Sequence, residues 1–215
     1  MVIHASKHQE MYGKIRNQCC AISLASLAMV LLFKLDYTLV TTITLDAAYE
    51  AGNELYLEHF GDNKSKAAFD FDGKNFDLMG FNFIINASFQ EYSGLLIQAH
   101  NPEVPDTMSL EDALIRFINE DHSLGILSSG GFSFGLSYSP KSGEFFLTDS
   151  HWCLPNGRRG TKSRENPGAA MRFRRLRHAV KFISRQISEN VDKDSLRKVF
   201  YNLTPIALEF HQSKL

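Results

Sequence analysis

The chain has 215 residues, of which 44% are hydrophobic and 22% are charged. This length suits one domain with a sizeable core, and this composition excludes a disordered tail. Three cysteines, two of them adjacent, exclude a disulfide framework and favour a reducing compartment, so we expect a cytoplasmic or nuclear protein.

The net charge of −1 conceals an uneven distribution of charge along the chain. Residues 1–150 carry 19 acidic and 9 basic side chains, whereas residues 151–215 carry 5 and 14. Such a split can reflect contact with nucleic acid or with a membrane surface. In a chain near neutrality it more often reflects separate solvated patches, so we expect no nucleic-acid partner.

The N-terminal part predicts a lead-in followed by a buried helix. Residues 1–16 are polar and predict an irregular lead-in, of which residues 1–8 precede the first candidate site residue. The uncharged run 17–33 favours a core helix. Lys14 and Arg16 before it also resemble the start of a signal peptide or signal anchor. The run is short for a span of roughly 20 residues and no small-residue cleavage site follows, so we predict no membrane span.

A second helix and a surface connection are predicted next. Residues 42–60 have a helical period, and Thr42 or Thr44 can cap that helix. Residues 61–80 are rich in Asp, Asn, Lys and Gly and predict a surface connection. Within it, residues 70–75 resemble a calcium loop, but the glycine falls too early and no bidentate Glu follows, so a turn is predicted.

The rest of the chain predicts strands with two further helices. Ser109 begins a capping box before a helix over residues 113–118, and another helix covers residues 176–187. The predicted strands are short apolar runs at residues 81–85, 94–97, 124–127, 131–139, 144–148, 169–174 and 199–210. The turn signal at 140–143 makes a hairpin, and Pro205 favours the sheet edge for the last strand.

Helices first and then mostly consecutive strands predict an α+β fold with a mainly antiparallel sheet, on which the N-terminal helical part packs. Residues 152–167 predict a polar loop. We expect one domain over residues 1–215, with residues 188–215 as a C-terminal extension of that domain.

A candidate nucleophile lies at the start of the apolar helix. Unpaired N–H groups and the helix dipole favour a thiolate there, which lowers the pKa of a cysteine on the first turn. Cys19 and Cys20 are adjacent, and neighbouring residues lie about 100° apart around a helix, so only one can face a base. Cys19 is nearer the helix start and is the preferred nucleophile.

A candidate base follows an apolar strand at the sequence Asp149-Ser150-His151. Residues two apart in a strand face the same way, so the Asp149 carboxylate could hold the tautomer of the His151 imidazole. Buried cysteines are common, and an Asp near a His is usually only a local hydrogen bond. Together, however, these residues supply a thiol, a base and an orienting group, which is the set that nucleophilic cysteine catalysis needs.

Other side chains near these candidates have open roles. The backbone N–H of Cys19 and an amide of Gln9, Asn17 or Gln18 could donate to the oxyanion of a tetrahedral intermediate. Cys153 is interpreted as a bystander. Trp152 could shield the hydrogen bond between His151 and Asp149 from water, or could simply pack.

Several segments carry a resemblance to a known family. They are Gln9, Tyr12-Gly13, Asn17-Gln18-Cys19, Leu45-Asp46-Ala47-Ala48-Tyr49-Glu50-Ala51-Gly52-Asn53-Glu54-Leu55-Tyr56, Phe145-Phe146-Leu147-Thr148-Asp149-Ser150-His151, and Gly168-Ala169-Ala170 with Arg172-Phe173. Spanning residues 9–187, they resemble the deubiquitinase domain of the herpesvirus large tegument protein. They are similar also to tegument-like deubiquitinases outside those viruses.

This resemblance implies a papain-like cysteine protease that cleaves the peptide or isopeptide bond after the C-terminal glycine of ubiquitin. It implies Cys19 as nucleophile, His151 as general base and then acid, and Asp149 as the orienting group. It implies Gln9 as oxyanion donor, with Gln18 or the backbone as alternatives because the interval between Gln9 and Cys19 is shorter than in the viral pattern. The implied partner is ubiquitin or polyubiquitin, and no cofactor or metal is expected.

Two features of the residues are consistent with this substrate. The acidic residues 1–150 would suit the basic surface and tail of ubiquitin, and Gly130-Gly131 would let an extended peptide approach the backbone closely. The alternatives are a cysteine acyltransferase or amidase with the same triad, a non-catalytic ubiquitin-binding module, and a membrane protein anchored by residues 17–33.

Overall fold

The computed structural model describes residues 1–12, 18–61, 67–96, 107–151, 153–158, 167–188 and 199–213, except the side chains of Gln9, Glu10 and Phe69. The helices are α1 (Cys19–Leu32), α2 (Thr42–Phe60), α3 (Leu110–Asn119) and α4 (Leu176–Ser188). The strands are β1 (Val2–His4), β2 (Asn75–Leu78), β3 (Phe81–Ala87), β4 (Tyr92–Leu95), β5 (Leu124–Ser129), β6 (Phe132–Ser139), β7 (Glu144–Asp149), β8 (Ala169–Phe173) and β9 (Phe200–Gln212).

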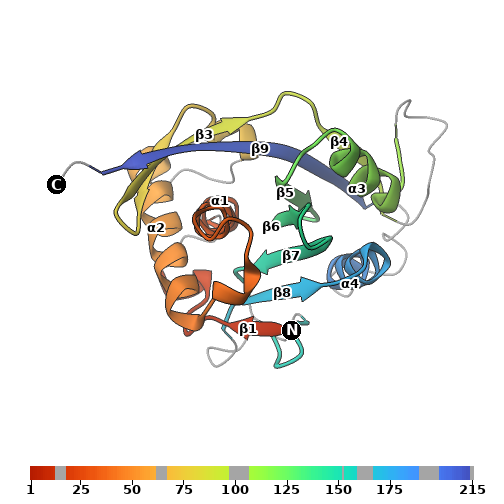
Figure 1. Cartoon of the computed structure of the whole chain (residues 1–215), viewed down its shortest axis with the longest axis horizontal. Coiled ribbons are helices and arrows are strands. Elements are labelled where there is room, and N and C mark those ends of the chain that lie inside the picture. Colours follow the sequence, from red (N-terminus) through yellow and green to blue (C-terminus); the bar gives the residue numbers. More distant parts are fainter. Residues whose placement is uncertain are drawn as a thin grey trace.

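These strands form one sheet in the order β1-β8-β7-β6-β5-β9-β3-β2, with β4 also paired to β9. Every pairing within the described residues is antiparallel. The predicted α+β class with an antiparallel sheet is therefore confirmed. Figure 1 shows α1 and α2 on one side of strands β5 to β8, and α3 and α4 on the other.

Two hydrophobic cores lie on opposite faces of this sheet. The first contains α1 and α2, and the second contains apolar residues of α3 and α4. Strand β7 contributes to both, because Phe146 belongs to the first core and its neighbours Phe145 and Leu147 to the second. Side chains alternate between the faces of a strand, so the centre of a strand covered on both faces is an unbroken apolar run, here Phe145, Phe146 and Leu147.

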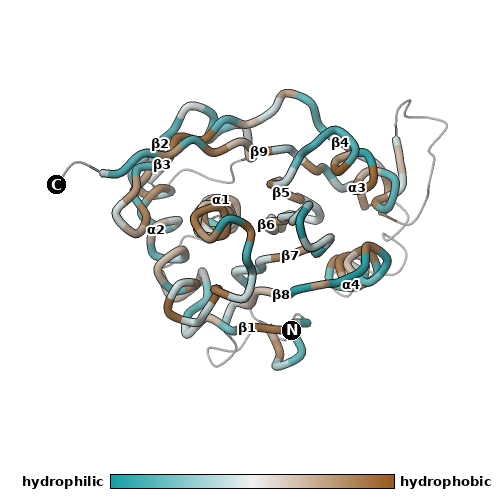
Figure 2. The backbone as a smooth tube through the Cα atoms, in the orientation of Figure 1, coloured by the Kyte–Doolittle hydropathy of each residue, from teal (hydrophilic) through white to brown (hydrophobic). Residues whose placement is uncertain are grey.

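Helix α1 is buried nearly along its whole length, and Figure 2 shows it in mainly hydrophobic colours. Its contact with α2 is very close at Gly52, where a Cβ atom would lie 2.4 Å from the Cα of Ile22. The predicted core helix is confirmed. Among the described residues, no helix is long and apolar enough to cross a membrane.

The cap of α2 differs from the prediction. Thr41 is the N-cap, and it forms a capping box with Thr44, whose backbone N–H donates to the Thr41 hydroxyl. Thr42 does not cap the helix, because its hydroxyl donates instead to the carbonyl of His4 at 2.8 Å. This bond ties the N-terminal strand β1 to α2.

Two segments predicted as irregular contain strands. Strand β1 lies within the predicted lead-in and pairs with β8, and β2 lies within the predicted connection 61–80 and pairs with β3. Both strands are three or four residues long, too short for a period to be recognised, and both depend on pairing with another segment.

Strand β9 runs through the centre of the sheet, so the edge position predicted from Pro205 is wrong. On one side β9 pairs with β5, and on the other it pairs with β4 up to Leu203 and with β3 from Ile206. The Pro205 carbonyl accepts a hydrogen bond from the N–H of Ser88 at 3.0 Å. An N–H at Pro205 would point to the same side, into the gap between β4 and β3, so its absence breaks no ladder.

The close approach at Gly52 predicts a large effect of one added methyl group. Gly52→Ala should lower the free energy of unfolding by about 2–3 kcal/mol, because the new Cβ would collide with the α1 backbone. Helix propensity alone would favour alanine by about 1 kcal/mol, so the sign of the change is diagnostic. Urea unfolding followed by circular dichroism measures it. The exposed control Glu58→Ala should change stability by less than about 0.5 kcal/mol.

Candidate active site

Cys19 is the first residue of α1 and is only 8% exposed. The N-cap residue Gln18 makes no side-chain capping bond, so the first-turn N–H groups of α1 are not taken by the cap. A thiolate at this position lies at the positive end of the helix dipole. Local structure therefore gives Cys19 the environment that the sequence predicted.

Asp149 ends β7, and His151 follows it directly after the strand. The Nδ1 atom of His151 lies 2.6 Å from Oδ1 of Asp149, and the His151 backbone N–H donates to the same oxygen at 3.0 Å. Asp149 is fully buried and His151 is 4% exposed. Because a carboxylate only accepts, Nδ1 must carry the proton, and Nε2 is the imidazole nitrogen that remains for another partner.

The structure places His151 close enough to Cys19 to influence the ionisation of its thiol. Burial by itself raises the pKa of the Cys19 thiol, but the hydrogen bond and charge of His151, together with hydrogen bonds from Ser133, lower it. The net result is a pKa below the ordinary value for cysteine. A buried thiol can be ionised more easily only where such partners outweigh the loss of water.

The start of β6 contributes two residues that the sequence did not single out. The backbone and hydroxyl of Ser133 lie close enough to Cys19 to lower the pKa of its thiol. The ring of Phe132 meets the His151 ring edge to face, with centroids 5.0 Å apart. No local motif marks either residue, because only the pairing of β6 with β7 and its packing on α1 brings them here.

Helix α2 supports the strand end that carries Asp149. The buried hydroxyl of Tyr49 donates to the Asp149 carbonyl at 3.0 Å. Gly168 lies against the same ring, since a Cβ there would be 2.5 Å from the Tyr49 hydroxyl. Both residues belong to segments that carried the family resemblance, but their contact was not predicted.

The predicted oxyanion donors remain a prediction. The side chain of Gln9 and all of Asn17 lie outside the described residues, although the backbone of Gln9 begins a 3-10 helix over Gln9–Tyr12. The amide of Gln18 is fully buried and donates to Oδ1 of Asn53 on α2 at 2.7 Å. Trp152 also lies outside the described residues.

The other two cysteines have different surroundings. Burial, followed by the charge of Cys19, raises the pKa of the Cys20 thiol well above its ordinary value. The Cys153 thiol donates to the His151 carbonyl at 3.3 Å. None of the three cysteines forms a disulfide. The described residues contain no cluster of three or more ligands suited to a metal ion.

This arrangement has the chemical parts of a thiol hydrolase: an activated thiol, an imidazole and a buried carboxylate. The fold is that of a viral ubiquitin-specific protease. A similar solved structure is the ubiquitin-specific protease encoded by murine cytomegalovirus tegument protein M48, in complex with a ubiquitin-based suicide substrate. The TM-score is 0.73 at 15% sequence identity, and the match covers 100% of this chain and 88% of that chain.

The resemblance to the tegument deubiquitinases is thus confirmed at the level of the fold. No family model matches the chain, and no curated protein sequence matches it. Because the sequence identity is only 15%, the comparison rests on the similarity of the two folds and not on similarity of the sequences.

The pKa of Cys19 can be tested by its reactivity. Alkylation of Cys19 by iodoacetamide, followed against pH by peptide mass spectrometry, should show a midpoint below that of an ordinary thiol. His151→Ala should move the midpoint to higher pH, because the lowering interactions are lost and burial remains. Cys20→Ala should leave the profile in place. An unchanged midpoint in His151→Ala would contradict the assigned contact.

The hydrogen bond from Tyr49 predicts that loss of its hydroxyl changes the reactivity of Cys19 as well as the stability of the protein. Tyr49→Phe leaves the buried Asp149 carbonyl without this donor and should cost about 1–3 kcal/mol of stability. It should also slow alkylation of Cys19 at neutral pH. Tyr92→Phe is the matched control, because that hydroxyl donates to Glu120 on a different part of the protein. Equal alkylation rates in the two variants would argue against a role for Tyr49 in positioning Asp149.

Proposed function

We propose that the chain is a deubiquitinase, a papain-like cysteine protease that cleaves the peptide or isopeptide bond after the C-terminal glycine of ubiquitin. The observation that carries the proposal is the buried pair of His151 and Asp149, 2.6 Å apart, beside Cys19 at the start of α1, where His151 lowers the pKa of the thiol. The fold of a viral ubiquitin-specific protease supports the choice of ubiquitin, alone or in chains, as the substrate.

The first half of the reaction forms an acyl-enzyme. His151 takes the proton of the Cys19 thiol at Nε2, and the thiolate attacks the carbonyl carbon of the terminal glycine. The resulting tetrahedral intermediate collapses when His151 returns that proton to the departing amine, which breaks the C–N bond. The amine product leaves, and ubiquitin remains attached to Cys19 as a thioester.

The second half releases ubiquitin. His151 removes a proton from a water molecule, and the hydroxide formed attacks the thioester carbonyl. Collapse of this second intermediate breaks the C–S bond, and the proton on His151 goes to the Cys19 sulfur. The products are free enzyme and the ubiquitin carboxylic acid, which ionises at neutral pH.

Two groups serve the developing charges in this mechanism. Asp149 keeps Nδ1 of His151 protonated and stabilises the imidazolium that forms. The full burial of Asp149 strengthens this interaction. The proposed hydrogen-bond donors to the oxyanion are the backbone N–H of Cys19 and the side-chain amide of Gln9. Gln18 is the weaker alternative, because one of its amide protons is already directed to Asn53.

The β5–β6 hairpin is the proposed border of the substrate channel. Gly130 and Gly131 form its turn, both with positive φ, directly before Phe132 and Ser133. A channel between this hairpin and the helix start would admit a tail without side chains, such as a terminal Gly-Gly. We also propose a reducing compartment, cytoplasm or nucleus, for an enzyme that depends on a free thiol.

A ubiquitin probe with a C-terminal propargylamide tests the proposal. Mixed with the protein, it should form a covalent adduct that intact mass spectrometry detects. The adduct should be lost in Cys19→Ala. It should be kept in Cys20→Ala, because the Cys20 thiol is buried and its pKa is raised.

Each other result has a distinct meaning. Loss of the adduct only in Cys20→Ala would keep the function and move the nucleophile. Binding of ubiquitin without an adduct would favour a non-catalytic ubiquitin-binding module. Inertness toward ubiquitin and related modifiers in a folded protein with a reactive Cys19 would favour an acyltransferase or amidase.

A further inference from the structure

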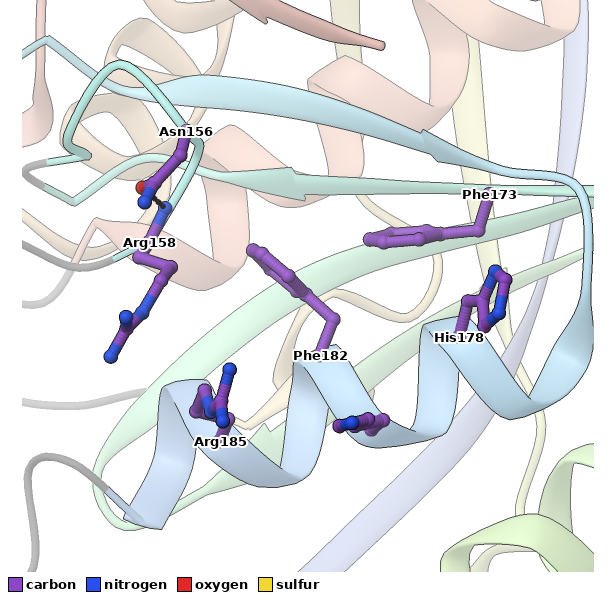
Figure 3. A pocket seen from close by; sticks show the side chains of 7 residues that line it. Asn156, Arg158, Phe173, His178, Phe182 and Arg185 are labelled. Atoms are coloured by element: carbon purple, nitrogen blue, oxygen red, sulfur yellow. Dashed lines mark hydrogen bonds between the residues drawn. The ribbon is translucent and has the colours of Figure 1, made fainter.

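A pocket lies away from the candidate active site, between the loop 153–158, the end of β8 and helix α4. Its volume is about 260 Å³. Figure 3 shows its lining side chains, which are Asn156, Arg158, Phe173, His178, Lys181, Phe182 and Arg185. None of these is Cys19, Asp149 or His151, so the pocket has no part in the proposed mechanism.

The lining is strongly basic. Arg158, Lys181 and Arg185 are cations, and none of the lining residues that the structure describes is acidic. Within the part of the chain that the structure describes, no carboxylate forms an ion pair with Lys181 or Arg185. The charges of Lys181 and Arg185, which have no carboxylate partner among the described residues, repel one another, and an anion in the recess relieves that repulsion.

A second recess continues the basic surface. It is lined by Met1, Arg172, Phe173, Arg174, Arg175 and His178, and thus shares Phe173 and His178 with the first. Glu144 binds the guanidinium of Arg172 through both oxygens and lies 3.5 Å from Arg174. One carboxylate therefore serves two arginines, and the surface as a whole keeps an excess of positive charge.

The floor of the first pocket is aromatic. Phe173 at the end of β8 and Phe182 on α4 lie with ring centroids 5.2 Å apart and planes inclined by 48°. Figure 3 shows the Phe182 ring between Phe173 on one side and the side chains of Arg158 and Arg185 on the other. A ligand that fits must offer an apolar side chain as well as negative charge.

The walls of the pocket are held in place by buried contacts. The side-chain amide of Gln186, on α4, donates to the Gly157 carbonyl at 3.1 Å and joins the helix to the loop. The loop is closed by two backbone bonds, in which the Leu154 N–H donates to the Arg158 carbonyl and the Gly157 N–H donates to the Leu154 carbonyl. Gly157 has a φ of 80° and lies against Met171, so only glycine fits there. The pocket is thus formed before any ligand arrives.

We propose that this pocket binds an acidic peptide segment of a partner protein, with carboxylates on Arg158, Lys181 and Arg185 and an apolar side chain on Phe173 and Phe182. Guanidinium groups match carboxylates in a two-point geometry. A long nucleic acid fits less well, because the chain has a net charge of −1 and its first 150 residues are acidic. The volume suits one large side chain with its charged neighbours.

Binding of a labelled peptide tests this directly. The probe has one phenylalanine between two pairs of glutamates, and its fluorescence anisotropy is followed at about 50 mM salt, where surface charges are weakly screened. Arg185→Glu should weaken binding about tenfold. Arg177→Glu is the matched control, because it makes the same change on the exposed face of the same helix but lines neither recess. It should leave affinity within about twofold.

Changes in the peptide test the aromatic floor without altering the protein. Replacing the phenylalanine of the probe by serine should weaken binding about fivefold, and replacing its glutamates by glutamines should abolish it. If Arg185→Glu fails to fold by circular dichroism, Lys181→Glu takes its place with the same expectation.

Three results would overturn the proposal. They are equal weakening in Arg185→Glu and Arg177→Glu, no binding of the acidic peptide, and tighter binding of a single-stranded oligonucleotide of equal charge that is sensitive to Arg185→Glu. The last result would assign the pocket to nucleic acid. Because the measurement does not involve Cys19, its outcome is independent of the ubiquitin probe.

Discussion

The burial of α1 on all sides is the constraint on which the rest of the structure depends. The helix can be enclosed only because two glycines leave room for its backbone: Gly52 on α2 and Gly135 on β6, where a Cβ would lie 3.0 Å from the Ser23 carbonyl. The sides of an apolar helix packed this closely are not accessible, and its N-terminus is the part that can present a side chain to a site. Cys19 is therefore presented at a fixed point, next to the ends of β6 and β7.

The candidate site is built from elements distant in sequence that pack against this helix. His151 is held by Asp149 from β7, faces Phe132 from β6 and lowers the pKa of Cys19 on α1. Burial makes each of these interactions stronger than it would be in water, and it would also penalise the thiolate if any were missing. The ionisation states of these groups thus depend on one another, so that removal of one partner changes the ionisation of another.

Two residues of the loop that follows His151, Cys153 and Gly157, link the candidate active site to the pocket beside α4. Cys153 bonds back to His151, whereas Gly157 is held by Gln186 on α4. Helix α4 has an apolar face in the second core and a cationic face around the pocket. Three basic residues from the last 65 positions, Arg158, Lys181 and Arg185, are therefore gathered on one surface, while the candidate thiol site contains the buried pair of His151 and Asp149.

Local patterns in the sequence determined the long helices, the strands of the central hairpins and the pairing of Asp149 with His151, because period, capping and turn signals act over a few residues. They also determined that Cys19 opens an apolar helix. Only the tertiary structure decided the strands β1 and β2, the central place of β9 around Pro205, and the contacts of Ser133 and Tyr49 with the site. Those features depend on which distant segments meet, and no local pattern encodes such a meeting.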